Sequence, residues 1–243
     1  NSANIKVDPP SSSGTYQTPT TAIDFLQFVD QIVDGSEGVA TKDPTAGTVV
    51  NRVYVEVHNR GVTPANGVQV MLLLANASAS LPALPSGYTA NVQSGTPIST
   101  AQWQTVGIKT VNDLRVGAPR IVEFDLPSTM LPPPASLPGQ AHFCALAILH
   151  STDDQFTSTQ TNVDQLTVSE RKVGQKNLHI VPYAGPTSPT QPQLVTIEIG
   201  ALVGDLLFDL RRFQGRLTLL LPEVIAKKLE GHVVGGKPLA KGA

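Results

Sequence analysis

The chain has 243 residues, enough for one large β domain or for a domain of about 180 residues with a smaller partner. It has 17 Lys and Arg residues against 19 Asp and Glu residues, a net charge of -2, and no stretch concentrates basic residues. This balance excludes a nucleic-acid-binding surface, which needs clustered positive charge. Only 15% of the residues are charged while Gly and Pro number 20 each, a composition typical of many short strands joined by turns.

The single cysteine and the hydropathy of the chain bear on disulfides and membrane spans. Cys144 is the only cysteine, so an intrachain disulfide is impossible and the redox compartment stays open. The sequence begins at Asn1 without a methionine or a charged-then-apolar leader, and we expect any signal peptide to have been removed. The longest apolar stretch, residues 194–210, contains three carboxylates and is too polar for a membrane helix of about 20 apolar residues. We therefore expect no membrane span.

Residues 1–50 are expected to form a leading strand and an arm. Segment 4–10 has the pattern of a short edge strand that ends at two prolines. Much of the sequence after it is rich in Ser, Thr and Gly, which favours loops. Residues 22–33 carry apolar side chains at mixed spacing, so a short helix and an irregular strand are both open there.

The first clear strand signal lies at residues 51–58, where valines alternate with polar or aromatic residues. Turn sequences follow at residues 59–61 and 64–67, and both contain Asn and Gly. Apolar residues then return at alternate positions over residues 68–74. The sequence therefore predicts two antiparallel strands.

Four further strands follow a long loop that is rich in Pro, Ser and Gly. They are predicted at residues 103–108, 120–126, 142–149 and 177–181. The first of them carries Trp103, which we expect to fill the core. The third is apolar on both faces, as expected of a central strand that is covered on each side. The chain is thus predicted to be all-β, with its strands concentrated in residues 51–181.

The C-terminal part is expected to form an extension. Residues 182–193 contain four prolines and are the predicted linker. Strand-like runs beyond it lie at residues 194–199, 206–210 and 216–221. Residues 222–230 suit a helical turn, and the glycine- and lysine-rich tail is expected to be mobile unless a partner orders it. The predicted extension and tail together cover residues 194–243.

A family resemblance covers residues 1–181. Segment 4–10, Asn-Ile-Lys-Val-Asp-Pro-Pro, followed by residues 51–61, Asn-Arg-Val-Tyr-Val-Glu-Val-His-Asn-Arg-Gly, is similar to bacterial CARDB-like domains. The likeness continues at residues 64–70, 139–147, 162–164 and 173–179. An acidic, hydrophobic insertion near residues 24–34 and the C-terminal strands have no counterpart in typical members.

This resemblance implies an immunoglobulin-like antiparallel β-sandwich, here with an extended N-terminal arm and extra C-terminal strands. CARDB-like domains are commonly attached to secreted bacterial proteins, including proteases, as accessory or adhesion-related modules. The resemblance therefore implies an extracellular or cell-surface location. It implies no catalytic activity, because strand patterns and an Asn-Arg-Gly turn record how a sandwich closes rather than what it binds.

The sequence offers no pattern of nucleophilic catalysis. Gly-x-Ser-x-Gly is absent, and Cys144 lies within an apolar strand, where a small buried hydrophobe is the simpler interpretation. The five histidines, His58, His142, His150, His179 and His232, lack metal-site spacing, although two of them flank one predicted strand. We therefore predict no catalytic residue, no metal site and no cofactor.

Four short polar or glycine-rich patterns are weaker signals of a binding or modification site. Asp153 and Asp154 follow the central strand and raise the question of a calcium ion, but their spacing matches no calcium loop and favours a turn. Four acidic residues near the arm, Asp24, Asp30, Asp34 and Glu37, are best interpreted as a solvated face. Gly235-Gly236-Lys237 lacks the spacing of a phosphate loop, and Asn76-Ala77-Ser78 is a formal glycosylation sequon.

Two functions remain for a chain without a predicted active site. The first is a non-catalytic structural protein that self-associates into a surface layer, filament or shell through edge strands and terminal arms. The alternative is an accessory adhesion or carbohydrate- or protein-binding module of a larger secreted polypeptide. Aromatic residues are only 5% of the chain, which weakens the carbohydrate version, and Trp103 and Tyr88 would be its test positions. Expected partners are copies of the chain or an associated protein.

Overall fold

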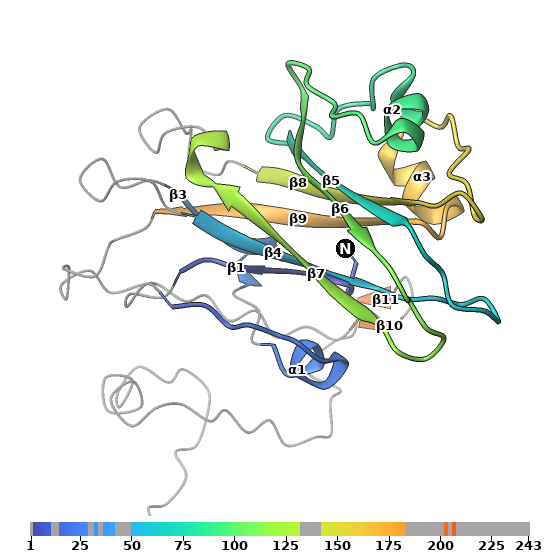
Figure 1. Cartoon of the computed structure of the whole chain (residues 1–243). Coiled ribbons are helices and arrows are strands. Elements are labelled where there is room, and N and C mark those ends of the chain that lie inside the picture. The colour runs from blue at the N-terminus through green and yellow to red at the C-terminus, as the bar shows by residue number, and fades with distance from the viewer. Residues whose placement is uncertain are drawn as a thin grey trace, which may run out of the picture. The chain divides into compact units, whose positions relative to one another are not determined.

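Two β-sheets pack against each other in the computed structural model of the chain (Figure 1). The structure describes residues 2–10, 15–28, 32–33, 36–41, 50–131, 142–182, 202–203 and 206–207. Strands predominate over helices, which confirms the prediction of an all-β sandwich. The sandwich lies in the first of two compact units, Asn1–Ile197, and the second unit is Glu198–Ala243.

The smaller sheet has three antiparallel strands in the order β1-β4-β7. They are β1 (Ile5–Asp8), β4 (Val50–Val57) and β7 (Arg120–Pro127). Strand β1 pairs only with β4 among the described strands, as predicted for an edge strand. Alternate residues of all three strands, including Val7, Val53 and Phe124, point into the sandwich core.

The larger sheet has six strands in the order β2-β3-β9-β8-β5-β6. Their bounds are β2 (Ile32–Val33), β3 (Ser36–Thr41), β5 (Val68–Asn76), β6 (Trp103–Val111), β8 (His142–His150) and β9 (Val173–Pro182). Strand β3 runs parallel to β9, and the other neighbours in this sheet are antiparallel. Strands β9 and β8 lie in the middle of the sheet, and β5 lies between β8 and the edge strand β6.

The connectivity is that of an immunoglobulin-like Greek key. Strand β4 pairs with β7 in one sheet, while β5 pairs with β8 and β8 with β9 in the other. Strands β4 and β5, predicted as two antiparallel neighbours in sequence, therefore belong to opposite sheets. The turns between them form as predicted: the Asn59 Oδ1 atom accepts a hydrogen bond from the Gly61 N–H group, and Gly67 has a φ of 62°.

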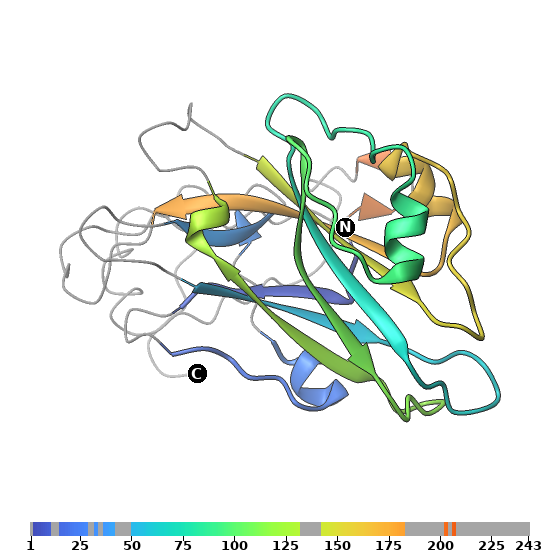
Figure 2. The same ribbon diagram turned by 45° about the horizontal axis from the view of Figure 1, so that its top comes forward.

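Strands β5 and β8 of the larger sheet are buried on both faces. Residues of β5 alternate between two cores, with Leu72 facing the smaller sheet and Leu73 facing outward. Helices α2 (Tyr88–Ser94) and α3 (Val163–Ser169) cover the outer face (Figure 2), and Trp103 is fully buried beneath them. The predictions of a doubly covered β8 and a buried tryptophan are thus correct.

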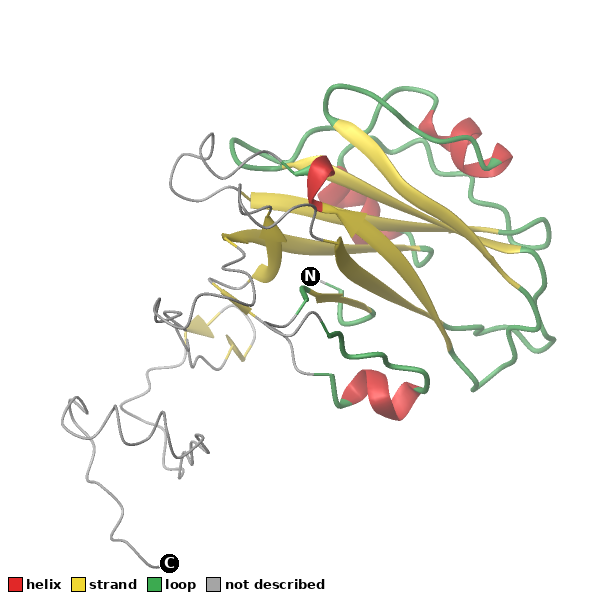
Figure 3. Ribbon diagram, turned by 60° about the vertical axis from the view of Figure 1, so that its left-hand side comes forward, coloured by secondary structure: helices red, strands yellow, loops and turns green. Residues whose placement is uncertain are grey.

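The N-terminal arm packs on the outside of the smaller sheet. Both alternatives that the sequence left open for residues 22–33 occur: helix α1 (Ala22–Leu26) begins with a capping box formed by Thr21 and Asp24, and β2 covers Ile32–Val33. Phe25 and Phe28 are buried against Tyr54, whose hydroxyl donates to the Gln17 carbonyl oxygen at 2.7 Å. Figure 3 shows the helices outside the two sheets, together with the 3₁₀ turn Ser128–Met130.

Several predictions fall on residues that the structure does not describe. They concern the linker after Pro182, the strands at residues 194–199 and 216–221, the helical turn at 222–230 and the tail. The predicted strand at residues 206–210 is described only at β11 (Leu206–Leu207), which forms a hairpin with β10 (Leu202–Val203).

Candidate functional site

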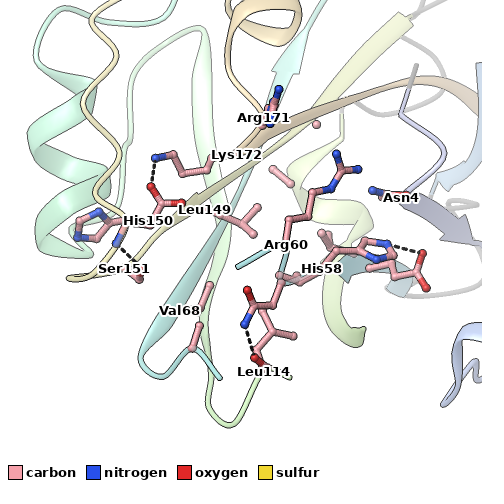
Figure 4. Close-up of a pocket in the computed structure, with 18 of the residues that line it drawn as sticks. Asn4, His58, Arg60, Val68, Leu114, Leu149, His150, Ser151, Arg171 and Lys172 are labelled. Carbon is pink, nitrogen blue, oxygen red and sulfur yellow. Dashed lines mark hydrogen bonds and ion pairs between the residues drawn. The ribbon is translucent and has the colours of Figure 1, made fainter. Parts of the chain in front are cut away.

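A cleft of about 590 Å³ opens at one end of the sandwich, and we call it the end cleft. Strands β4 and β8 end here, and β1, β5 and β9 begin here. Its walls come from these strand ends, from the β4–β5 loop and from the two ends of the β8–β9 connection (Figure 4). This volume is in the range of about 300–1,000 Å³ that is usual for small-molecule sites.

The floor of the end cleft is apolar because it is the edge of the sandwich core. Val57, Val68 and Leu114 are buried members of that core and also line the cleft. Leu149 and Ala65 pack against the same core but are only partly buried. A molecule in the cleft would therefore contact aliphatic side chains of both sheets.

Two arginines lie on the rim, one from each side. Arg60 extends from the β4–β5 loop toward the beginning of β9, where Arg171 and Lys172 lie (Figure 4). Both arginines are exposed, and neither guanidinium group has an ion-pair or hydrogen-bond partner within the described ranges. By contrast, Arg115 on the neighbouring β6–β7 loop pairs with the Asp113 carboxylate at 3.0 Å.

Local hydrogen bonds fix the backbone on which these two arginines stand. The Asn59 side-chain amide donates to the carbonyl oxygens of Thr63 and Leu114, at 2.7 and 2.8 Å. Arg171 sits in a tight turn after α3, where the Glu170 carboxylate accepts from the Lys172 N–H group at 3.2 Å. The side chains of Asn59 and Glu170 thus fix the backbone at the two rim positions.

Apart from Asp153, the other charged groups of the end cleft have partners in the chain. The Lys172 ammonium group contacts the Asp154 carboxylate at 2.6 Å and donates to the Gln155 carbonyl oxygen at 2.9 Å. The His58 ring lies 3.1 Å from the Glu56 carboxylate. Asp153 is exposed and has no partner among the described residues, so two cations and one anion remain unpaired.

His150 also lines the cleft, but its ring serves the fold. Its Nδ1 atom accepts a hydrogen bond from the Phe156 N–H group at 3.1 Å, which requires that atom to be unprotonated. Burial, followed by the nearby Lys172 charge, lowers the pKa of His150 below its ordinary value. The imidazole is therefore held in its neutral form.

The remaining residues that the sequence singled out do not gather into one site. Cys144 is fully buried, and burial raises the pKa of its thiol to about 12, so it is the small core hydrophobe that was expected. His142 and His179 meet across β8 and β9, with ring centroids 5.6 Å apart, at the opposite end of β8 from His150. Among the described residues, no group of three or more His, Cys, Asp or Glu side chains suits a metal ion.

The candidate carbohydrate positions are buried rather than exposed. Trp103 donates its indole N–H group to the Ala83 carbonyl oxygen at 3.1 Å, and the Tyr88 hydroxyl donates to the Gln160 carbonyl oxygen at 3.0 Å. Both are core residues, so neither offers a face on which a sugar ring could stack. The truncations at these positions would therefore test the fold rather than sugar binding.

The acidic candidates also have local roles where they are described. Asp24 caps α1, and the hydrogen bonds from Thr20 and Thr21 lower the pKa of its carboxyl group. Asp154 is used by the ion pair with Lys172. Asp30, Asp34, His232 and residues 235–237 lie outside the described residues, as does the side chain of Glu37.

Sequence reasoning missed both rim arginines. Arg60 was part of a predicted turn, and Arg171 lay in an unassigned stretch before a predicted strand. The missing information was the sheet pairing: strands β4 and β8 end at the same end of a Greek-key sandwich. With that pairing known, Arg60, which follows β4, and Arg171, which precedes β9, are expected at the same end of the sandwich.

Comparisons with protein-family models and with curated proteins gave no match. Within the described part of the chain, none of the helices combines the length and the apolar character needed to cross a lipid bilayer.

Proposed function

We propose that the chain is a non-catalytic binding module that recognises its partner through the end cleft. The observation that carries this proposal is the cleft itself, with its apolar floor and two rim arginines that lack partners in the described chain. A concave apolar site with a few convergent polar groups is the usual form of a ligand site.

The position of the cleft supports the proposal by analogy of fold. In immunoglobulin variable domains, the loop after the second strand and the loop between the last two strands lie at the recognition end. The β4–β5 loop and the β8–β9 connection hold the same places in this Greek key, and both line the end cleft. The likeness to variable domains is one of loop position alone, because one fold supports many functions.

The side chains of the cleft favour binding over catalysis. His58 is paired with Glu56, but no described serine, threonine or cysteine side chain hydrogen-bonds to its ring. The Cys144 thiol lies on the other side of the larger sheet, in the core beneath α2 and α3. A nucleophile activated by a neighbouring base, which covalent catalysis requires, is therefore missing from the described part of the cleft.

The resemblance to CARDB-like domains supplies the wider setting of the proposal. An accessory module of a larger secreted polypeptide needs a stable scaffold and a recognition surface, and no catalytic centre. The proposed location is accordingly extracellular or at the cell surface, with a protein or a small molecule as the partner.

A pair of adjacent substitutions tests the proposal. Thr63 is exposed and lines the end cleft, whereas Val62 is 96% exposed and does not line it. We expect Thr63→Trp to obstruct the cleft and Val62→Trp to leave it open. A fragment library screened by ligand-observed NMR should give hits on the wild-type chain that Thr63→Trp loses and Val62→Trp keeps. Hits unaffected by Thr63→Trp would place recognition elsewhere.

Self-association through sheet edges is the second candidate, favoured by the edge of β7. Strand β7 pairs only with β4 among the described strands, so its outer backbone groups are available. Three charged residues on β7, Arg120, Glu123 and Asp125, oppose unselective pairing with a neighbour.

Strand β6 is a less open edge than β7. Its beginning is covered by residues 98–100, since Thr105 N–H donates to the Ile98 carbonyl oxygen at 2.8 Å, and the pairing register shifts opposite Leu72 and Leu73. These features place self-association second. Light scattering over a wide concentration range tests it, and a monomer at every concentration would overturn it.

A further inference from the structure

We propose that the end cleft binds an organic anion that has an apolar body, with the anionic group on Arg60 and Arg171. This inference rests on the proposed function, because it names the ligand class of the same site. Three properties of the cleft support it: the apolar floor, the unpaired charged groups on the rim and the planar shape of the guanidinium groups.

The floor selects a ligand with an apolar portion. Leu149 and Ala65 are only partly buried, and they continue the aliphatic surface of the core into the cleft. A ligand that covers this surface removes it from water, which stabilises the complex. A fully hydrated ion would leave that surface uncovered, so a small inorganic anion alone does not match the cleft.

The unpaired charge selects an anion. Lys172 is neutralised by Asp154, and His58 lies against Glu56. Arg60 and Arg171 remain without partners in the described chain, against the single exposed carboxylate of Asp153. On the rim, the two unpaired guanidinium groups therefore outnumber the one unpaired carboxylate, while the His58–Glu56 contact is an ion pair only when the imidazole is protonated. Positive charge on a concave rim attracts anions and penalises ligands of the same sign.

The shape of the cationic groups indicates what kind of anion fits. A guanidinium group presents parallel N–H donors that match the two oxygens of a carboxylate or a phosphate, whereas an ammonium group acts as a point charge. Arg115 shows this fit within the chain, since both its Nε and Nη2 groups contact the Asp113 carboxylate at 3.0 Å. The shared chemistry is therefore a carboxylate or phosphate attached to an apolar chain.

Four probes separate these properties. Hexanoate combines an apolar chain with a carboxylate, hexanamide keeps the chain without charge, acetate keeps the carboxylate without the chain, and hexyl phosphate exchanges the anionic group. NMR titration of the ¹⁵N-labelled protein at low ionic strength measures each affinity. We expect hexanoate to shift signals of cleft residues and to bind more tightly than hexanamide or acetate.

Charge variants then assign the anionic group to its site. Arg60→Gln and Arg171→Gln are each expected to weaken hexanoate binding roughly fivefold, the scale of an exposed charged contact. Hexanamide binding should not change. Arg115→Gln is the matched control, because it removes an exposed arginine that already has a partner outside the cleft. Circular dichroism and thermal melting confirm that each variant is folded.

The outcomes distinguish the two proposals. Equal affinities for hexanoate and hexanamide, with no effect of either arginine variant, overturn the anion inference while cleft binding stands. Failure of every probe, together with library hits that Thr63→Trp does not affect, overturns the proposed function as well. Hexyl phosphate binding more tightly than hexanoate, with the same loss in both arginine variants, supports the anion inference and makes phosphate the source of the charge.

Discussion

The outer face of the larger sheet and the end cleft are two regions where apolar side chains continue beyond the sandwich interior. The first is closed by the chain itself: α2, α3 and their connecting loops cover Trp103, Leu146 and Phe156 completely. The second stays open at the end of the sandwich, with partly buried Leu149 on its floor. The two regions share β5 and β8 yet differ in how their polar groups are used.

In the closed region, three large polar side chains bond to the chain's own backbone, whereas the buried Gln69 Oε1 atom has no hydrogen-bond partner among the described residues. The Gln93 amide donates to the Phe156 carbonyl oxygen at 2.8 Å, as the Trp103 and Tyr88 side chains do to other carbonyl groups. On the rim of the cleft, Arg60 and Arg171 have no such partners in the described chain. Internally satisfied polar groups indicate a structural role, whereas unpaired cations beside an apolar floor indicate recognition.

Trp103→Ala is expected to cause the largest loss of stability in the closed region. The indole is fully buried, so its removal leaves a cavity and should lower the free energy of unfolding by about 3–5 kcal/mol. Urea denaturation followed by far-UV circular dichroism measures the change. The adjacent exposed residue gives the control: Gln104→Ala should change stability by no more than about 0.5 kcal/mol. Equal effects at the two positions would contradict a packed core on this face.

A leucine-to-alanine substitution in each region shows whether the vacated space is closed or open to water. Leu166 on α3 is fully buried in the closed region, and Leu166→Ala should cost about 3 kcal/mol, including a cavity term. Leu149 borders the cleft, where water can occupy the vacated space, so Leu149→Ala should cost about 1 kcal/mol. Urea denaturation of both variants tests the difference. A larger loss for Leu149→Ala would mean that the end cleft is not open in solution.

The strand positions were predictable because period-2 alternation records burial directly. Val53, Phe124 and Leu72 face the core as the sequence indicated, and β8 is covered on both sides. The separation of β4 and β5 into opposite sheets was not predictable, since both an adjacent hairpin and a Greek key use two alternating strands. Helices α2 and α3 were missed because seven residues give too few turns for a clear amphipathic pattern.

The site was harder to predict than the fold. The residues with the most evident chemistry, Cys144 and Trp103, are core residues. Arg60 and Arg171 are ordinary loop residues in sequence, and they acquire meaning only because two strand ends bring them to one rim. The net charge of the chain argues against a large basic surface. It cannot reveal a local site where two arginines lack carboxylate partners.

His150 links the two regions and gives the smallest expected effect. It lines the end cleft, while its Nδ1 atom accepts from the N–H group of Phe156, which packs in the closed region. Because its pKa is lowered in the folded state, the unfolded chain takes up a proton near the ordinary value of 6.5 while the folded chain does not. Stability should therefore fall as the pH drops below this value and level off below the folded-state pKa.

Urea denaturation between about pH 5 and pH 7 measures this dependence against the ordinary histidine pKa near 6.5. His150→Gln removes the titrating group and should flatten the dependence, since glutamine can keep an oxygen acceptor for the Phe156 N–H group without binding a proton. The ¹⁵N signals of the imidazole give an independent measurement of the folded-state midpoint. A midpoint above that of free histidine would mean that the ring can charge within the fold, and would make His150 a further cation of the cleft beside Arg60, Arg171 and Lys172.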